Sequence, residues 1–223
     1  LVAVLLKFSS LPDKPAAVVE EEGVSASTRN SALSYPQLIL GMIGIFVYVG
    51  VEVSTASNLP AYMESDLGFD TKDIAPFISL YWASLMIGRW TGAVEAFTDN
   101  MNTQKILRFV APYLAFGVFL GVNKFMNHDL TPFYVYALII LVLIFADMAG
   151  KGNPARMLLI FSVLGIAALL VGMATNGMVS VYAFTSVGLF CSTLWPCIFT
   201  LAISGLGKHT SQGSSFLIMM IMG

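Results

Sequence analysis

Six long apolar segments, separated by short polar stretches, constrain the fold of this chain more than any other feature. Each is close to the roughly 20 residues that a helix needs to cross the hydrocarbon core of a bilayer. They cover residues 38–59, 75–94, 106–122, 133–149, 157–174 and 179–203. Charged residues make up only 11% of the chain, against about 25% in soluble domains. Because lipid offers no hydrogen bonds to the backbone, the sequence predicts an all-α, polytopic membrane bundle.

The two ends suggest that the chain is a piece of a longer protein. It opens on the apolar run "LVAVLL" and closes inside another apolar run. We expect residues 1–6 to be the end of a preceding transmembrane helix and a further span to start at 213. Residues 7–35 contain Pro, Ser, Ala and an acidic triplet, a composition typical of a flexible connector. Residues 36–223 are then the bundle itself.

The distribution of Lys and Arg predicts the orientation, because cytoplasmic loops of membrane proteins are enriched in these residues. One set of alternating loops carries Lys7, Lys14, Arg29, Lys105, Arg108, Lys151, Arg156 and Lys208. The other carries Lys72 and Lys124 among the acidic residues Glu64, Asp66, Asp70, Asp73 and Asp129. The first set is therefore expected to face the cytoplasm, in a multi-pass protein of the cytoplasmic (inner) membrane. The third and fourth segments form a pair, so this pattern also permits two interfacial or re-entrant segments there.

A carboxylate inside the first segment points to a polar path through the protein. Glu52 shares one helical face with Tyr48 and Thr55, at i, i+4 and i+7, and Asn58 flanks that face. An ionisable group at such depth costs about 2.5–3.5 kcal/mol to insert. Glu52 is therefore expected to face a cavity and bind substrate, the alternative being a packing role, protonated or hydrogen-bonded to a neighbouring helix. Pro60 is expected to end this helix.

The second segment contains two further candidates. Trp82 offers a flat apolar ring and one N–H donor, which suit a sugar, although a ring facing lipid or the core fits equally. Arg89 lies near the inner end, where it either snorkels to the surface or has a gating role. At the inner end of the fourth segment, Asp147 and Lys151 are expected to form a surface ion pair.

The sixth segment is rich in small polar residues around a Trp–Pro pair. Pro196 interrupts the backbone ladder and is expected to kink the helix, as a structural or gating element. Ser192, Thr193 and Trp195 lie close to it. Broken polar helices beside a cavity are common in transporters, but such side chains also bond within their own helix.

The sequence lacks the motifs of several other function classes. Its two histidines, His128 and His209, fall in loops, so the sequence offers no histidine metal cluster. It has neither a Gly-rich phosphate loop with Lys nor a G-x-S-x-G elbow. A net charge of −2 gives no indication of nucleic-acid binding. We therefore predict neither an enzyme, nor a metal site, nor a nucleic-acid partner.

Three stretches resemble the fucose–galactose–glucose:proton symporter family of the major facilitator superfamily. "YVGVEVSTAS" resembles its seventh helix, "IGRWTGA" its eighth, and "LWPCIFTLAISGLGKHTSQGSSFLIMMIMG" its tenth helix, the loop that follows and the start of the eleventh. The likeness covers residues 36–97 and 157–223. Residues 98–154 hold the third and fourth segments where the family has a short loop, so they look like an inserted transmembrane hairpin.

The resemblance implies the C-terminal half of a twelve-helix secondary active transporter. Such proteins import a hexose or deoxyhexose (fucose, galactose or glucose type) by proton symport with alternating access, and need no cofactor beyond the coupling proton. The expected partners are the sugar, the proton, the lipid bilayer and the N-terminal half of the same transporter. A sugar-contact role carries over to Glu52 and Asn58, with stacking from Trp82 or Trp195. The alternative is a non-transporting membrane sensor or scaffold that keeps the fold.

Overall fold

The computed structural model describes residues 31–94 and 100–222. The predictions for 1–6 and for most of 7–35 fall outside these ranges. The described part holds α-helices and short 3₁₀ turns, without a strand. The α-helices are α2 (Pro36–Ser65), α3 (Thr71–Ala93), α4 (Met101–Phe125), α5 (Tyr136–Gly150), α6 (Pro154–Ala174), α7 (Met178–Cys191), α8 (Leu194–Ile203) and α9 (Thr210–Met219).

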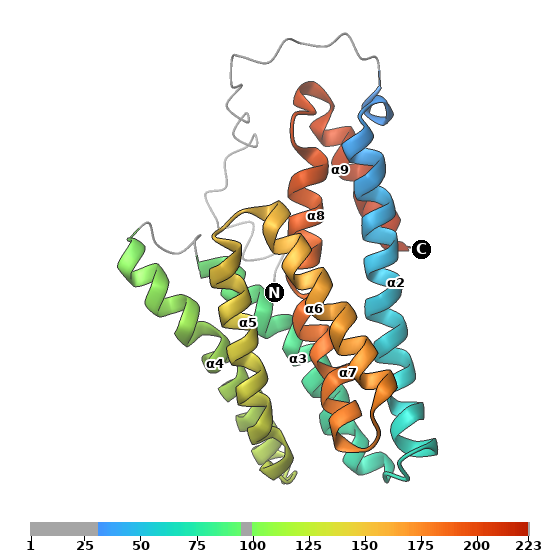
Figure 1. The fold of residues 1–223 in the computed structure, drawn as a ribbon, viewed down its shortest axis with the longest axis vertical. Coiled ribbons are helices and arrows are strands. Elements are labelled where there is room, and N and C mark those ends of the chain that lie inside the picture. Colours follow the sequence, from blue (N-terminus) through green and yellow to red (C-terminus); the bar gives the residue numbers. More distant parts are fainter. Residues whose placement is uncertain (1–30, 95–99, 223) are drawn as a thin grey trace, which may run out of the picture.

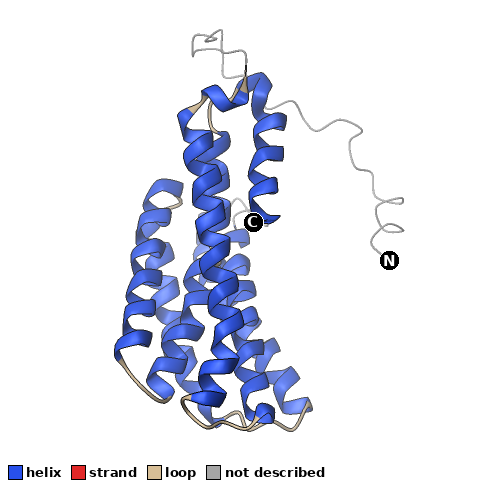
Figure 2. Ribbon diagram, turned by 90° about the vertical axis from the view of Figure 1, so that its right-hand side faces the viewer, coloured by secondary structure: helices blue, strands red, loops and turns tan. Residues whose placement is uncertain are grey.

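The helices run alternately up and down along one long axis, except that α8 continues in the direction of α7, and the described loops lie mostly at the two ends of the bundle (Figures 1 and 2). Helix α3 packs against α2, α4 and α7, while α8 packs against α2 and α6. The α4–α5 hairpin lies at one side of the bundle, with α4 against α3 and α5 against α6 (Figure 1). An all-α, polytopic bundle is thus confirmed.

Within the described residues, five segments are long and apolar enough to cross a membrane. They are Pro36–Ser65, Asn102–Phe125, Thr131–Gly150, Pro154–Ala174 and Met178–Ile203. They correspond to five of the six predicted spans, including both members of the expected hairpin. Helix α3 has 23 residues but is not among these five segments. The second predicted span, 75–94, therefore stays a prediction.

Helix α2 does not end at Pro60, so that expectation was wrong. The helix continues to Ser65, where the N–H of Asp66 donates to the carbonyl of Tyr62 (3.0 Å). A proline leaves one carbonyl of the preceding turn without its usual donor, here that of Ala56, and long membrane helices tolerate this loss. Packing of the buried Leu59 and Met63 stabilises the last turns.

The sixth apolar segment forms two helices rather than one. α7 ends at Cys191, α8 begins at Leu194, and Ser192 and Thr193 form a turn between them. Pro196 explains the position of the break, because its ring collides with the carbonyl four residues earlier, that of Ser192, and it has no N–H to donate. The break therefore lies just before the proline and places polar side chains in the middle of the bundle.

A partly buried ion pair connects the two helices of the hairpin. Asp147 is only 4% exposed, and its carboxylate lies 3.3 Å from the guanidinium of Arg108 on α4. The expected surface pair with Lys151 was therefore wrong. An antiparallel hairpin brings the start of α4 level with the end of α5, so Arg108 reaches Asp147 from the facing helix. Buried charges in membrane helices are usually paired in this way.

Tyr136 joins the hairpin to the rest of the bundle. Its hydroxyl lies 2.7 Å from Ser84 Oγ on α3 and 3.3 Å from the carbonyl oxygen of Thr185 on α7. Tyr136 and Ser84 are fully buried, so no water replaces a lost bond. Three helices thus meet at one hydroxyl group.

We expect Tyr136→Phe to lower the free energy of unfolding by about 0.5–1.5 kcal/mol, the net value of a buried hydrogen bond. Thermal unfolding of the detergent-solubilised protein measures this loss. Tyr134→Phe is the matched control, because Tyr134 is 59% exposed. Equal melting temperatures for the two variants would contradict the anchoring role.

Candidate functional site

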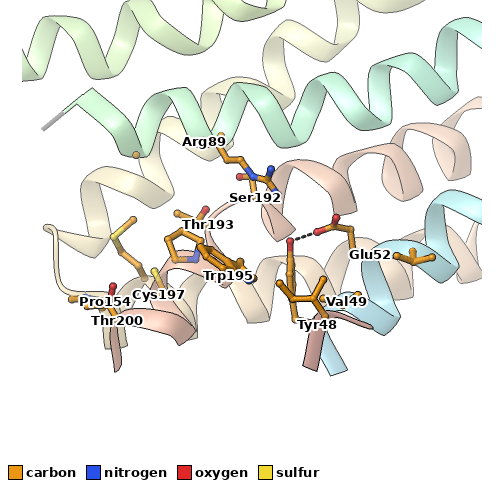
Figure 3. A pocket seen from close by; sticks show the side chains of 16 residues that line it. Tyr48, Val49, Glu52, Arg89, Pro154, Ser192, Thr193, Trp195, Cys197 and Thr200 are labelled. Atoms are coloured by element: carbon orange, nitrogen blue, oxygen red, sulfur yellow. Dashed lines mark hydrogen bonds between the residues drawn. The ribbon is translucent and has the colours of Figure 1, made fainter. Parts of the chain in front are cut away.

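A cavity of about 780 Å³ opens among α2, α3, the start of α6 and the break between α7 and α8 (Figure 3). Its volume is within the range of about 300–1,000 Å³ typical of small-molecule sites. It is lined by Tyr48, Val49, Glu52, Val53, Gly88, Arg89, Gly92, Pro154, Met157, Ser192, Thr193, Trp195, Pro196, Cys197, Thr200 and Ile221. The predicted residues Tyr48, Glu52, Arg89, Trp195 and Pro196 thus meet in one place.

Glu52 is held at the cavity by two tyrosines. The hydroxyl of Tyr48, one turn earlier on α2, donates to the Glu52 carboxylate (Figure 3). Tyr81 on α3 donates to the backbone carbonyl of Glu52 at 2.8 Å. Both tyrosine side chains are buried, so they fix this turn of α2. The carboxylate keeps further lone pairs, which can accept hydrogen bonds from a ligand hydroxyl.

Arg89 reaches into the same cavity from α3, and Figure 3 shows its side chain beside Ser192. A second cavity of about 290 Å³ shares Glu52 and Arg89 with the first and adds Trp82, Leu85, Met86 and Trp90. Trp82 therefore lies next to the main cavity rather than inside it. Its ring is half exposed and packs edge-on against Tyr81, with centroids 5.7 Å apart.

Two predicted residues lie outside both cavities. Thr55 donates to the carbonyl of Val51 (2.8 Å), and the exposed Asn58 donates to that of Ser54 (2.7 Å). Both side chains bond within their own helix, as short polar side chains in membrane helices often do. A sugar contact by either residue stays a prediction.

Sequence reasoning did not select Gly88 and Gly92, which line the cavity beside Arg89. The available signal was their spacing, because residues four apart share a helical face. A Cβ added to Gly88 would lie 2.5 Å from the Cβ of Ser192, so only glycine lets α3 approach the break so closely. Across the described residues, no cluster of three or more His, Cys, Asp or Glu side chains could hold a metal.

The fold and cavity define a class: a multi-pass helical membrane protein with a cavity lined by a few polar side chains. Comparison with known proteins shows which members of this class the chain is similar to. A glucose/galactose transporter of Brucella abortus (strain 9-941) is 30% identical over 213 residues, 94% of this chain and 39% of the relative. A putative glucose/galactose transporter of Helicobacter pylori (strain 26695) is 29% identical over 223 residues, all of this chain and 40% of the relative. Along nearly its whole length the chain is thus similar to glucose/galactose transporters, which supports a sugar transporter family of the major facilitator type.

A third relative is an L-fucose-proton symporter of Escherichia coli (strain K12), 36% identical over 76 residues, which are 34% of this chain and 17% of that protein. No family model matches the chain, and no solved structure matches it at a significant level. The chain spans about two fifths of the length of the Brucella and Helicobacter relatives.

Proposed function

We propose that this chain is the C-terminal half of a secondary active transporter that imports a hexose or deoxyhexose by proton symport with alternating access. The similarity to glucose/galactose transporters along nearly the whole chain supports the sugar class. The similarity to the L-fucose-proton symporter of Escherichia coli supports coupling to protons. An N-terminal half of the same protein is the partner that would close the site from the other side.

The observation that carries the proposal is the cavity at the break between α7 and α8. It combines a carboxylate, a guanidinium, hydroxyls and an indole in one pocket, from Glu52, Arg89, Thr193 and Trp195 among others. Sugars present many hydroxyls together with apolar C–H faces. A site of a few convergent polar groups on an otherwise apolar wall is the usual solution for such ligands.

Alternating access requires contacts that differ between the inward-open and outward-open states. The α7–α8 break is well placed for this change, because its backbone ladder is interrupted beside the cavity. Glu52 fits two roles: as a carboxylate it accepts bonds from sugar hydroxyls, and as a protonatable group it couples them to the proton.

Uptake of radiolabelled fucose, galactose and glucose by cells that produce the whole transporter tests the proposal, with and without a protonophore. We expect accumulation of at least one sugar, abolished by the protonophore. Accumulation that survives the protonophore would refute proton coupling. Uptake of none of the three, with the protein present in the membrane, would refute the sugar assignment.

A further inference from the structure

Thr193 stands apart from every other buried serine and threonine of the described residues. The others donate to a backbone carbonyl, which is how such side chains are normally satisfied in helices. They are Ser84, Thr91, Ser180, Thr185, Ser186 and Ser192. Thr193 is 6% exposed, and its Oγ1 has no hydrogen-bond partner.

The indole N–H of Trp195, two residues later, is also buried without a partner. The described residues contain just one other such side-chain atom, the hydroxyl of Tyr62, which lies outside both cavities. Thr193 and Trp195 both line the main cavity, beside the helix break (Figure 3). A buried polar atom without a partner costs about 1–3 kcal/mol, and two such atoms at one site call for an explanation.

The ring of Trp195 is already partly occupied, which changes its expected role. It stacks on Phe199 of the same helix, with centroids 5.1 Å apart and ring planes at 22°. One face is thus covered by protein, and the group that lacks a partner is the N–H at the ring edge. Because one face of its ring is covered, Trp195 is better suited to donate a hydrogen bond to a sugar than to stack on it.

We propose that Thr193 Oγ1 and Trp195 Nε1 form the subsite that recognises an individual hydroxyl of the transported sugar. The indole donates to that hydroxyl, and the threonine hydroxyl exchanges a hydrogen bond with it or with its neighbour on the sugar ring. Both atoms are closed off from water in this conformation, so ligand contact requires a small rearrangement at Ser192–Thr193, where the backbone ladder is interrupted. This inference rests on the proposed sugar transport. It adds the two side chains that distinguish one sugar from another.

Thr193→Val in the whole transporter tests the subsite, because valine keeps the shape and removes the hydroxyl. We expect affinity for radiolabelled D-galactose to fall roughly 3- to 10-fold. The melting temperature should stay equal or rise, since the variant loses an unpaired polar group. A purely structural role would instead lower stability. Thr185→Val is the matched control: its hydroxyl donates to Val181 (2.7 Å) outside the cavity, so affinity should not change.

Monodeoxy analogues of galactose locate the partner hydroxyl. The wild type should bind one analogue more weakly than galactose, and Thr193→Val should discriminate less between the two, because only the Trp195 indole still contacts that hydroxyl, as in a double-mutant cycle. Thr193→Ser should restore the wild-type pattern, and Thr193→Ala replaces the valine variant if that protein fails to fold. Identical analogue profiles for wild type and Thr193→Val would overturn the subsite while leaving sugar transport intact. A wild type that binds neither galactose, glucose nor fucose would overturn both.

Discussion

Glu52→Gln in the whole transporter is expected to reduce sugar accumulation by roughly 10- to 100-fold. Gln retains the size of the side chain and an oxygen that accepts from Tyr48, so local packing is preserved. It removes the negative charge and the titrating proton. A hydrogen bond to a charged group is worth about 1.5–3 kcal/mol, which corresponds to the expected loss. Initial rates and steady-state levels of radiolabelled sugar measure it.

Glu64→Gln on the same helix is the matched control, because Glu64 is exposed and lines neither cavity. It should transport like the wild type. Exchange of sugar across the membrane without a proton gradient separates the two roles of Glu52. Exchange that persists in Glu52→Gln would assign the residue to proton coupling, and exchange that is lost would assign it to sugar binding. Wild-type accumulation in Glu52→Gln would make Glu52 a packing residue.

The six long apolar segments were sufficient to predict the bundle, because each must satisfy its own backbone in lipid. Segment ends were harder to predict. Pro60 was expected to end a helix, but the packing of α2 carries the helix past it. Pro196 did mark an interruption, and the break appears at the preceding Ser192–Thr193 turn. Local sequence gives the same signal in both cases, and tertiary contacts decide the outcome.

The candidate site was predictable where one helix face carried it. Tyr48 and Glu52 are four residues apart, and they contact each other as that spacing requires. The same spacing rule selected Thr55, which lies outside both cavities, because a helix face says nothing of where a neighbouring helix crosses it. Contacts between side chains of different helices could not be predicted for the same reason. Examples are the bond from Tyr81 to Glu52 and the Arg108–Asp147 pair.

The close approach of α3 to the α7–α8 break leaves no room for a side chain at Gly88. A Cβ there would lie 1.7 Å from Ser192 Oγ and 2.5 Å from Ser192 Cβ. Rotation of the serine side chain relieves only the first clash and gives up its 2.6 Å bond to the Leu189 carbonyl. We therefore expect Gly88→Val to force the two elements apart and to lower the free energy of unfolding by about 1–3 kcal/mol.

Gly117→Val is the matched control, because nothing lies within 4 Å of a Cβ added to this exposed residue of α4. Thermal unfolding in detergent compares the two variants, and sugar binding is measured on each folded protein. Since Gly88 lines the cavity, the variant that still folds should also bind sugar more weakly, as a displaced break moves Thr193 and Trp195 together. Equal stability of both variants would show that α3 and the break have room to separate, and would remove the steric reason for a glycine at this position.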